Sequence, residues 1–172
     1  PLKPGLILVG PWRGKPNKLV QFRKSVREFQ SLTGWPVFAD PLSAISSEQL
    51  GIIEFWELLI TAIPFVNTNI QVLRLGPLSS SKKLEEFLNK LTGDQIVITE
   101  GEDRYLDPLL IAKQYSNGLH SWLLLFLQSY KGRCLQPSKE SLNLFNSFYS
   151  NNEKIRKYLE NKLDLVGDLN EI

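Results

Sequence analysis

The sequence of 172 residues contains one cysteine, one histidine and no methionine. The single cysteine, Cys134, excludes an internal disulfide, so we expect a reducing, cytoplasmic compartment. The single histidine, His120, precedes an apolar helical pattern, which favours a capping or packing role over catalysis. Because methionine is missing and the first residue is proline, we expect a segment of a longer protein.

Long apolar runs and an excess of one charge are missing as well. The longest apolar run, Trp122–Leu127, falls far short of the roughly 18 residues that a membrane span needs, and no signal-peptide pattern is visible. Twenty basic residues against 18 acidic ones give a net charge of only +2, without the clustered basic face of a nucleic-acid-binding protein. An apolar content of 42% is sufficient for a globular core, so we expect neither membrane nor nucleic acid as a partner.

Short apolar runs bounded by glycine or proline alternate along the chain with segments of helical spacing. Such runs are typical of strands that are buried on both faces of a parallel sheet. The predicted strands are Leu6–Val9, Val37–Ala39, Val72–Leu75 and Ile96–Thr99, with a weaker one within Leu110–Tyr115. The predicted helices are one capped by Asn17 and closed by Gly34, then Ile52–Ile63, Ser81–Leu91 with Gly93 as its stop, and His120–Tyr130.

The alternation predicts an α/β fold: a three-layer, Rossmann-like sandwich around a mostly parallel sheet of five or six strands. We expect residues 1–136 to form this domain. Residues 137–172 are polar and helical in pattern, rich in Lys, Glu and Asn, and are expected to form a helical C-terminal extension outside the sheet.

Two strands end in the same dipeptide, in "LILVGPWRG" and in "VLRLGPLSS". Loops at the carboxyl ends of parallel strands are where doubly wound sheets bind ligands. A Gly-Pro pair also makes a good tight turn without any ligand. Both interpretations stay open for Gly10-Pro11 and for Gly76-Pro77.

The stretch "PLSSSKKLEEFL" places Ser79, Ser80 and Ser81 at the expected start of a helix and Lys82 and Lys83 in its first turn. Backbone N–H groups at a helix start favour an anion, whereas cations there oppose the helix dipole by roughly 0.3–1 kcal/mol each. The pattern therefore fits either a carboxylate-binding site or a capped helix with two solvated lysines.

No other motif indicates chemistry. A dinucleotide fingerprint, a phosphate-binding P-loop, zinc-ligand spacing and a nucleophile elbow are all missing, so we predict no catalytic, cofactor-binding or metal-binding residue. Asp103, Arg104 and Asp107 form a charged cluster in which Arg104 either pairs with its neighbours or lines an anion pocket. The four tryptophans are expected to pack in the core or against loops.

Four stretches together resemble the middle domain of a known enzyme family: "GPWRG", "GWPVFADPLS", "VLRLGPLSSSKKLEEFL" and "GEDRYLDP". They occur in the order of the thiamine-diphosphate-dependent 2-succinyl-5-enolpyruvyl-6-hydroxy-3-cyclohexene-1-carboxylate synthases, the MenD family of menaquinone and phylloquinone biosynthesis. The resemblance covers roughly Gly5 to Pro108.

The resemblance implies a parent transferase that decarboxylates 2-oxoglutarate on thiamine diphosphate and joins the product to isochorismate, with Mg²⁺ holding the cofactor. It implies two further domains and a homodimeric or homotetrameric parent. The family's cofactor motif and activating glutamate are missing from this chain, so the segment is expected to be inert alone and to hold no cofactor.

Within the resemblance, Ser80, Ser81 and Lys82 match a loop of the middle domain that binds substrate carboxylate, and Lys83 falls where some members have arginine. Arg104 matches a basic position of the family whose role here is open. Two alternatives remain: a nucleotide- or FAD-binding module, as in related middle domains, or a structural domain without a ligand.

Overall fold

The computed structural model describes residues 2–49, 51–62, 68–131 and 135–167, with side chains described up to residue 163. It confirms the predicted α/β fold, with a five-stranded sheet in which every pair of neighbours is parallel. The strand order is β2-β1-β3-β4-β5. The strands are β1 (Gly5–Val9), β2 (Val37–Ala39), β3 (Gln71–Leu75), β4 (Gln95–Ile98) and β5 (Lys113–Tyr115). Cys134 lies outside the described residues.

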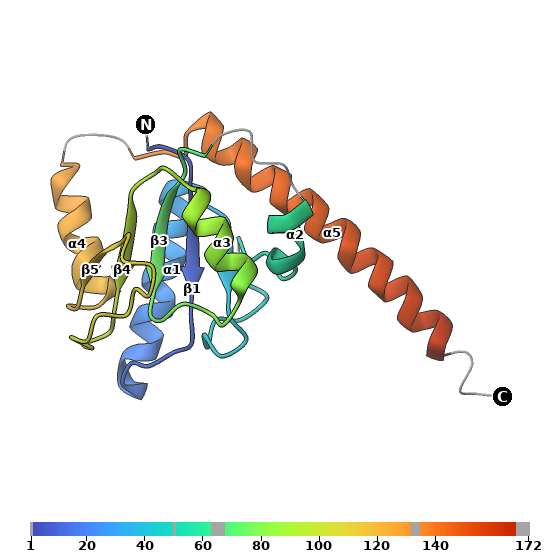
Figure 1. Cartoon of the computed structure of the whole chain (residues 1–172), viewed down its shortest axis with the longest axis horizontal. Coiled ribbons are helices and arrows are strands. Elements are labelled where there is room, and N and C mark those ends of the chain that lie inside the picture. Colours follow the sequence, from blue (N-terminus) through green and yellow to red (C-terminus); the bar gives the residue numbers. More distant parts are fainter. Residues whose placement is uncertain (1, 50, 63–67, 132–134, 168–172) are drawn as a thin grey trace.

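Helices cover both faces of this sheet (Figure 1). One face packs against α1 (Leu19–Thr33) and α4 (Leu119–Ser129), and the other against α2 (Trp56–Ala62), α3 (Lys82–Lys90) and α5 (Lys139–Gly167). Successive side chains of a strand point to opposite faces, and β1 shows this alternation clearly. Leu6 and Leu8 belong to the α2/α3/α5 core, whereas Ile7 and Val9 belong to the α1/α4 core. A strand that must be apolar on both faces explains the continuous apolar runs of the sequence.

The first predicted helix has the expected end but a different start. Gly34 closes α1 with a left-handed φ of 66°, and its N–H donates to the Gln30 carbonyl oxygen. The prediction that Asn17 caps this helix is wrong. A 3₁₀ turn, η1 (Pro16–Lys18), precedes α1, and Lys18 occupies the N-cap without a side-chain hydrogen bond. A proline at the first position of the turn favours this tighter geometry, because its φ is already helical and no N–H is lost.

Two other helix boundaries also differ from the predictions. The helix expected from Ile52 begins only at Trp56, because Ile52 forms a parallel bridge with Val37 at the edge of the sheet. The helix predicted over Ser81–Leu91 ends one residue early, at Lys90, and its C-cap is the extended Leu91 rather than Gly93. A short apolar run fits a strand as well as a helix, so its spacing alone could not place the start of α2.

The long helix α5 joins the domain along its first half and then projects beyond it (Figure 1). Phe148 is fully buried in the α2/α3 core, and the Asn152 Oδ1 atom accepts a hydrogen bond from the Phe55 N–H at 3.0 Å. A salt bridge of 3.1 Å joins Arg156 to Glu54. The C-terminal helical extension is therefore present, while the proposed domain boundary after residue 136 stays a prediction. None of the helices in the described residues is long and apolar enough to cross a membrane.

Candidate functional site at the carboxyl edge of the sheet

The two Gly-Pro loops noted in the sequence lie against each other at the carboxyl edge of the sheet. The Gly10 N–H donates to the Leu75 carbonyl oxygen at 2.9 Å, and the Gly76 N–H donates to the Ile98 carbonyl oxygen at 2.8 Å. A Cβ atom at Gly10 would come within 1.7 Å of the Pro77 carbonyl oxygen, so only glycine permits this approach. Because strand order reverses between β1 and β3, the loops meet where doubly wound sheets form their ligand clefts.

A cleft opens beside these loops, and the rings of Trp12 and Phe22 pack on each other in it with centroids 4.6 Å apart. Its acidic side chains already have partners. The Glu100 carboxylate accepts the Leu119 N–H at 2.8 Å and thereby caps α4, and Glu102 pairs with arginines described below. The cleft is therefore a mainly apolar recess whose charged groups are engaged by neighbouring protein groups.

The structure confirms Ser81 as the N-cap of α3. Its backbone is extended (φ −139°, ψ 112°), and its Oγ atom accepts a hydrogen bond from the Leu84 N–H at 3.3 Å. The same hydroxyl donates to the Glu57 Oε1 atom at 2.6 Å, and the Ser81 residue is only 8% exposed. The Ser81 hydroxyl is therefore engaged both as donor and as acceptor by the protein itself, whereas the neighbouring Ser80 is exposed.

The two lysines at the start of α3 extend into solvent. The Lys82 side chain is 88% exposed, and its Nζ atom lies 4.0 Å from the Glu86 Oε1 atom one helical turn away. Lys83 is exposed and forms no ion pair within the described part of the chain. Exposed ion pairs of this kind are worth at most about 1 kcal/mol, so both ammonium groups remain available to an anionic ligand.

Arg104 lies on the loop between β4 and β5, and its side chain is 78% exposed. It pairs with Glu102, which also lies 3.7 Å from an Arg13 guanidinium nitrogen. Arg104 thus pairs with a neighbour, which is Glu102 rather than Asp103 or Asp107, while its place in an anion pocket stays a prediction. No hydrogen bond or ion pair joins Arg104 to the start of α3 among the described residues.

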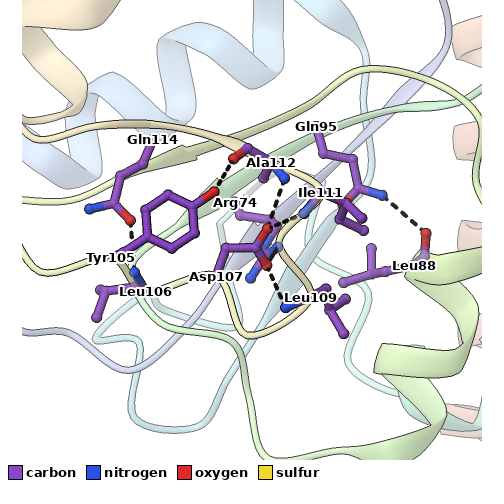
Figure 2. A network of polar contacts seen from close by, with 10 residues as sticks. All are labelled: Arg74, Leu88, Gln95, Tyr105, Leu106, Asp107, Leu109, Ile111, Ala112 and Gln114. Carbon is purple, nitrogen blue, oxygen red and sulfur yellow. Dashed lines mark hydrogen bonds and ion pairs between the residues drawn. The ribbon is translucent and has the colours of Figure 1, made fainter.

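Asp107 forms a buried ion pair that sequence reasoning missed (Figure 2). The Arg74 Nη1 atom donates to the Asp107 Oδ1 atom at 2.6 Å, and both side chains are at most 1% exposed. The carboxylate also accepts the N–H groups of Ile111 and Ala112 at 2.8 Å and of Leu109 at 3.2 Å. An arginine in the middle of a buried strand, "VLRLG", was the available signal, because a buried charge requires a partner.

Burial opposes ionisation of Asp107, but the hydrogen bonds from Arg74 and Ala112 and the Arg74 charge outweigh it. The pKa of the Asp107 carboxyl is therefore held below its usual value, and the group is ionised at neutral pH. The Arg74 Nε and Nη2 atoms are buried without a hydrogen-bond partner among the described residues. The pair therefore depends strongly on the one contact with Asp107.

Further hydrogen bonds hold the same loop against β5 (Figure 2). The Tyr105 hydroxyl donates to the Ala112 carbonyl oxygen at 2.8 Å, and the Leu106 N–H donates to the Gln114 side-chain oxygen at 2.8 Å. The Gln114 amide nitrogen in turn donates to the Arg104 carbonyl oxygen at 2.7 Å. The backbone that carries Arg104 is thus fixed even though its side chain is exposed.

His120 contacts a neighbouring helix, and the acidic residues form no metal-binding cluster in the described part of the chain. The His120 Nδ1 atom lies 3.4 Å from the Ser25 Oγ atom, between α4 and α1, which agrees with the predicted packing role. No group of three or more His, Cys, Asp or Glu side chains in the described residues could hold a metal ion.

The five parallel strands, with the loops at their carboxyl edge, define a doubly wound α/β domain. No family model matches the chain. It is 55% identical over 170 residues to the 2-succinyl-5-enolpyruvyl-6-hydroxy-3-cyclohexene-1-carboxylate synthase of Prochlorococcus marinus strain SARG, covering 98% of this chain and 28% of that protein. Proteins of the same name from Prochlorococcus marinus strain MIT 9313 and Synechococcus sp. strain CC9902 are 39% and 37% identical, each over 99% of this chain.

The chain spans less than a third of the length of these relatives: 28%, 30% and 29%. A match at 55% identity over nearly the whole chain makes it a partial segment of a protein of this synthase family, MenD. The resemblance first seen in four short stretches is therefore confirmed along almost the entire sequence.

Proposed function

We propose that this segment is the middle domain of a MenD synthase and that the start of α3 binds a carboxylate of the substrate. The observation that carries the proposal is the pair of exposed lysines in the first turn of α3. Residues selected for helix stability alone would be acidic there, because the N-terminal end of the dipole is positive. A ligand carboxylate placed between the helix start and the ammonium groups offsets that cost.

The chemistry implied by the relatives' name fits this site. A product with a succinyl arm, an enolpyruvyl group and a ring carboxylate carries several negative charges. We propose that Lys82 is the main contact, with Lys83 and the Ser80 hydroxyl as supporting donors. Ser81 has a different part: its hydroxyl is engaged by Glu57 and the Leu84 N–H, so it shapes the helix start.

For the full-length parent we propose the family reaction: a transferase of menaquinone or phylloquinone biosynthesis that uses 2-oxoglutarate and isochorismate. Thiamine diphosphate and Mg²⁺ are proposed as its cofactors. No residue of this segment is assigned to either one: the sequence lacks the family's cofactor motif, and the described residues offer no cluster of metal-ligating side chains. The segment would supply a scaffold and one substrate-binding loop, and it would be inert alone.

The same proposal places two further domains and a second subunit of a cytoplasmic homodimer or homotetramer around this segment. A second candidate function rests on the position of the Gly-Pro loops, at the edge of the sheet where doubly wound folds bind nucleotides, although the recess beside them has a volume of only about 20 Å³. Adding FAD and ADP separately to the purified chain, and following its melting temperature, tests this alternative. A saturable rise with either ligand would favour the nucleotide-binding module.

The decisive variant is Lys82→Ala in the full-length parent, with Lys90→Ala as a matched control because Lys90 is an exposed lysine in the last turn of the same helix. Loss of a charge-assisted hydrogen bond costs about 1.5–3 kcal/mol, which is about ten- to a hundredfold in kcat/KM. We expect this loss for Lys82→Ala, mainly through KM, and none for Lys90→Ala. Unchanged kinetics for Lys82→Ala would favour the other interpretation, in which α3 is a capped helix with two solvated lysines and no ligand.

A further inference from the structure

A carboxylate from a different helix contacts the start of α3. Glu57 lies in the first turn of α2, and its Oε1 atom accepts the Ser81 hydroxyl proton at 2.6 Å. The Ser81 Oγ atom accepts the Leu84 N–H at 3.3 Å. The chain of contacts therefore runs from α2, through one hydroxyl group, to the backbone of α3.

The contact fixes the orientation of the Ser81 hydroxyl. A hydroxyl group has one proton and two lone pairs, and its rotor turns to suit its partners. When the proton is donated to Glu57, a lone pair is left for the Leu84 N–H, which is what an N-cap requires. A hydrogen bond to an ionised acceptor is roughly twice as strong as a neutral one, so this arrangement is well defined.

The position of Glu57 has an electrostatic consequence as well. Its carboxylate lies near the N-terminal ends of two helices, in the first turn of α2 and beside the N-cap of α3, where negative charge is favourable.

We propose that Glu57 is a positioning residue for the substrate-binding start of α3. Its hydrogen bond fixes the Ser81 cap, and with it the helix start from which Lys82 extends. This inference rests on the proposed function of Lys82, and Glu57 itself touches no substrate.

The test compares Glu57→Ala with Glu57→Gln in the full-length parent, because glutamine can still accept the Ser81 hydroxyl proton but carries no charge. Glu48→Ala is the control, since Glu48 is exposed on the loop before α2 and forms no ion pair among the described residues. We expect Glu57→Ala to raise KM about five- to thirtyfold with kcat changed less than about twofold, and Glu57→Gln to restore most of that loss. Melting temperatures measured on each variant verify that it is folded.

A double variant with Ser81→Ala adds a readout that a purely structural contact would not give. If Glu57 acts through the cap, its removal in the Ser81→Ala background should add little to KM, because the two residues form one unit. Independent, multiplying effects on KM would overturn the inference, as would a KM for Glu57→Ala within about twofold of the parent or a Glu57→Gln variant as impaired as Glu57→Ala.

Lys82→Ala, measured alongside, separates the failure of this inference from failure of the proposed function. If Lys82→Ala raises KM and Glu57→Ala does not, only the role of Glu57 is refuted. If Lys82→Ala leaves KM unchanged, the carboxylate site itself is refuted, and the positioning role is refuted with it whatever Glu57→Ala does.

Discussion

The buried pair between Arg74 and Asp107 allows a quantitative prediction for the stability of the chain. Asp107→Asn keeps the size of the side chain but removes its charge, and it leaves the Arg74 guanidinium buried beside a neutral amide. Breaking a buried ion pair by removing one partner costs about 3–5 kcal/mol, because the remaining charge is uncompensated. Two Arg74 nitrogens already lack partners among the described residues, so the protein offers no obvious substitute acceptor.

Urea unfolding followed by circular dichroism measures this loss directly. We expect Asp107→Asn to lower the free energy of unfolding by about 3–5 kcal/mol, or the melting temperature by roughly 6–20 °C for a chain of this size. Asp107→Ala should cost more, because it also leaves the N–H groups of Leu109, Ile111 and Ala112 without an acceptor. The control is Asp103→Asn, an exposed carboxylate on the same loop.

A loss below about 1 kcal/mol for Asp107→Asn would refute the reasoning, since that is the size expected of an exposed pair. The double variant Arg74→Met with Asp107→Asn sharpens the test. The added Arg74→Met removes the uncompensated buried charge, and the Asn oxygen can still accept backbone N–H groups of the loop. The double variant should therefore recover a large part of the stability that Asp107→Asn loses.

Three further predictions concern pH, the loop contact and the helix cap. Because folding lowers the pKa of Asp107, the ionised carboxylate stabilises the folded chain fully above about pH 4, and this contribution is lost as the pH falls through the folded-state pKa. In an acid titration, Asp107→Asn should therefore lose stability less steeply than the parent chain. Gly10→Ala should lower the melting temperature, because the added Cβ would overlap the Pro77 carbonyl oxygen, and an unchanged value would contradict that close approach. Ser81→Ala should lower the unfolding free energy by about 0.5–2 kcal/mol in urea titrations, whereas no change would show that the cap, with its bond to Glu57, is not formed.

The sheet was predictable from sequence because its strands are buried on both faces. The run Leu6–Val9 has no polar residue, and Val72–Leu75 is apolar apart from Arg74, which is what a central parallel strand requires. Two helix caps were also predictable from the sequence: Gly34 ends α1 and Ser81 caps the start of α3, as predicted. Such signals are local, so a few neighbouring residues are sufficient to specify them.

The buried ion pair and the hydrogen bond that links α2 to α3 could not be predicted from the local sequence pattern. Arg74 and Asp107 are 33 residues apart, and only the path of the loop over the sheet brings them together. Glu57 and Ser81 are 24 residues apart and meet because two helices pack side by side. Asp107 was grouped with Arg104 because they are close in sequence, whereas the structure turns their side chains to different partners.

The central claim is that the start of α3 recognises a substrate carboxylate, and a thermodynamic cycle tests it most directly. The dissociation constants of the carboxylated substrate and of its neutral methyl ester are measured for the full-length parent and for Lys82→Ala. We expect the parent to prefer the carboxylate and Lys82→Ala to lose about ten- to a hundredfold of that preference, while its affinity for the ester changes little. An equal preference in parent and variant would contradict the claim.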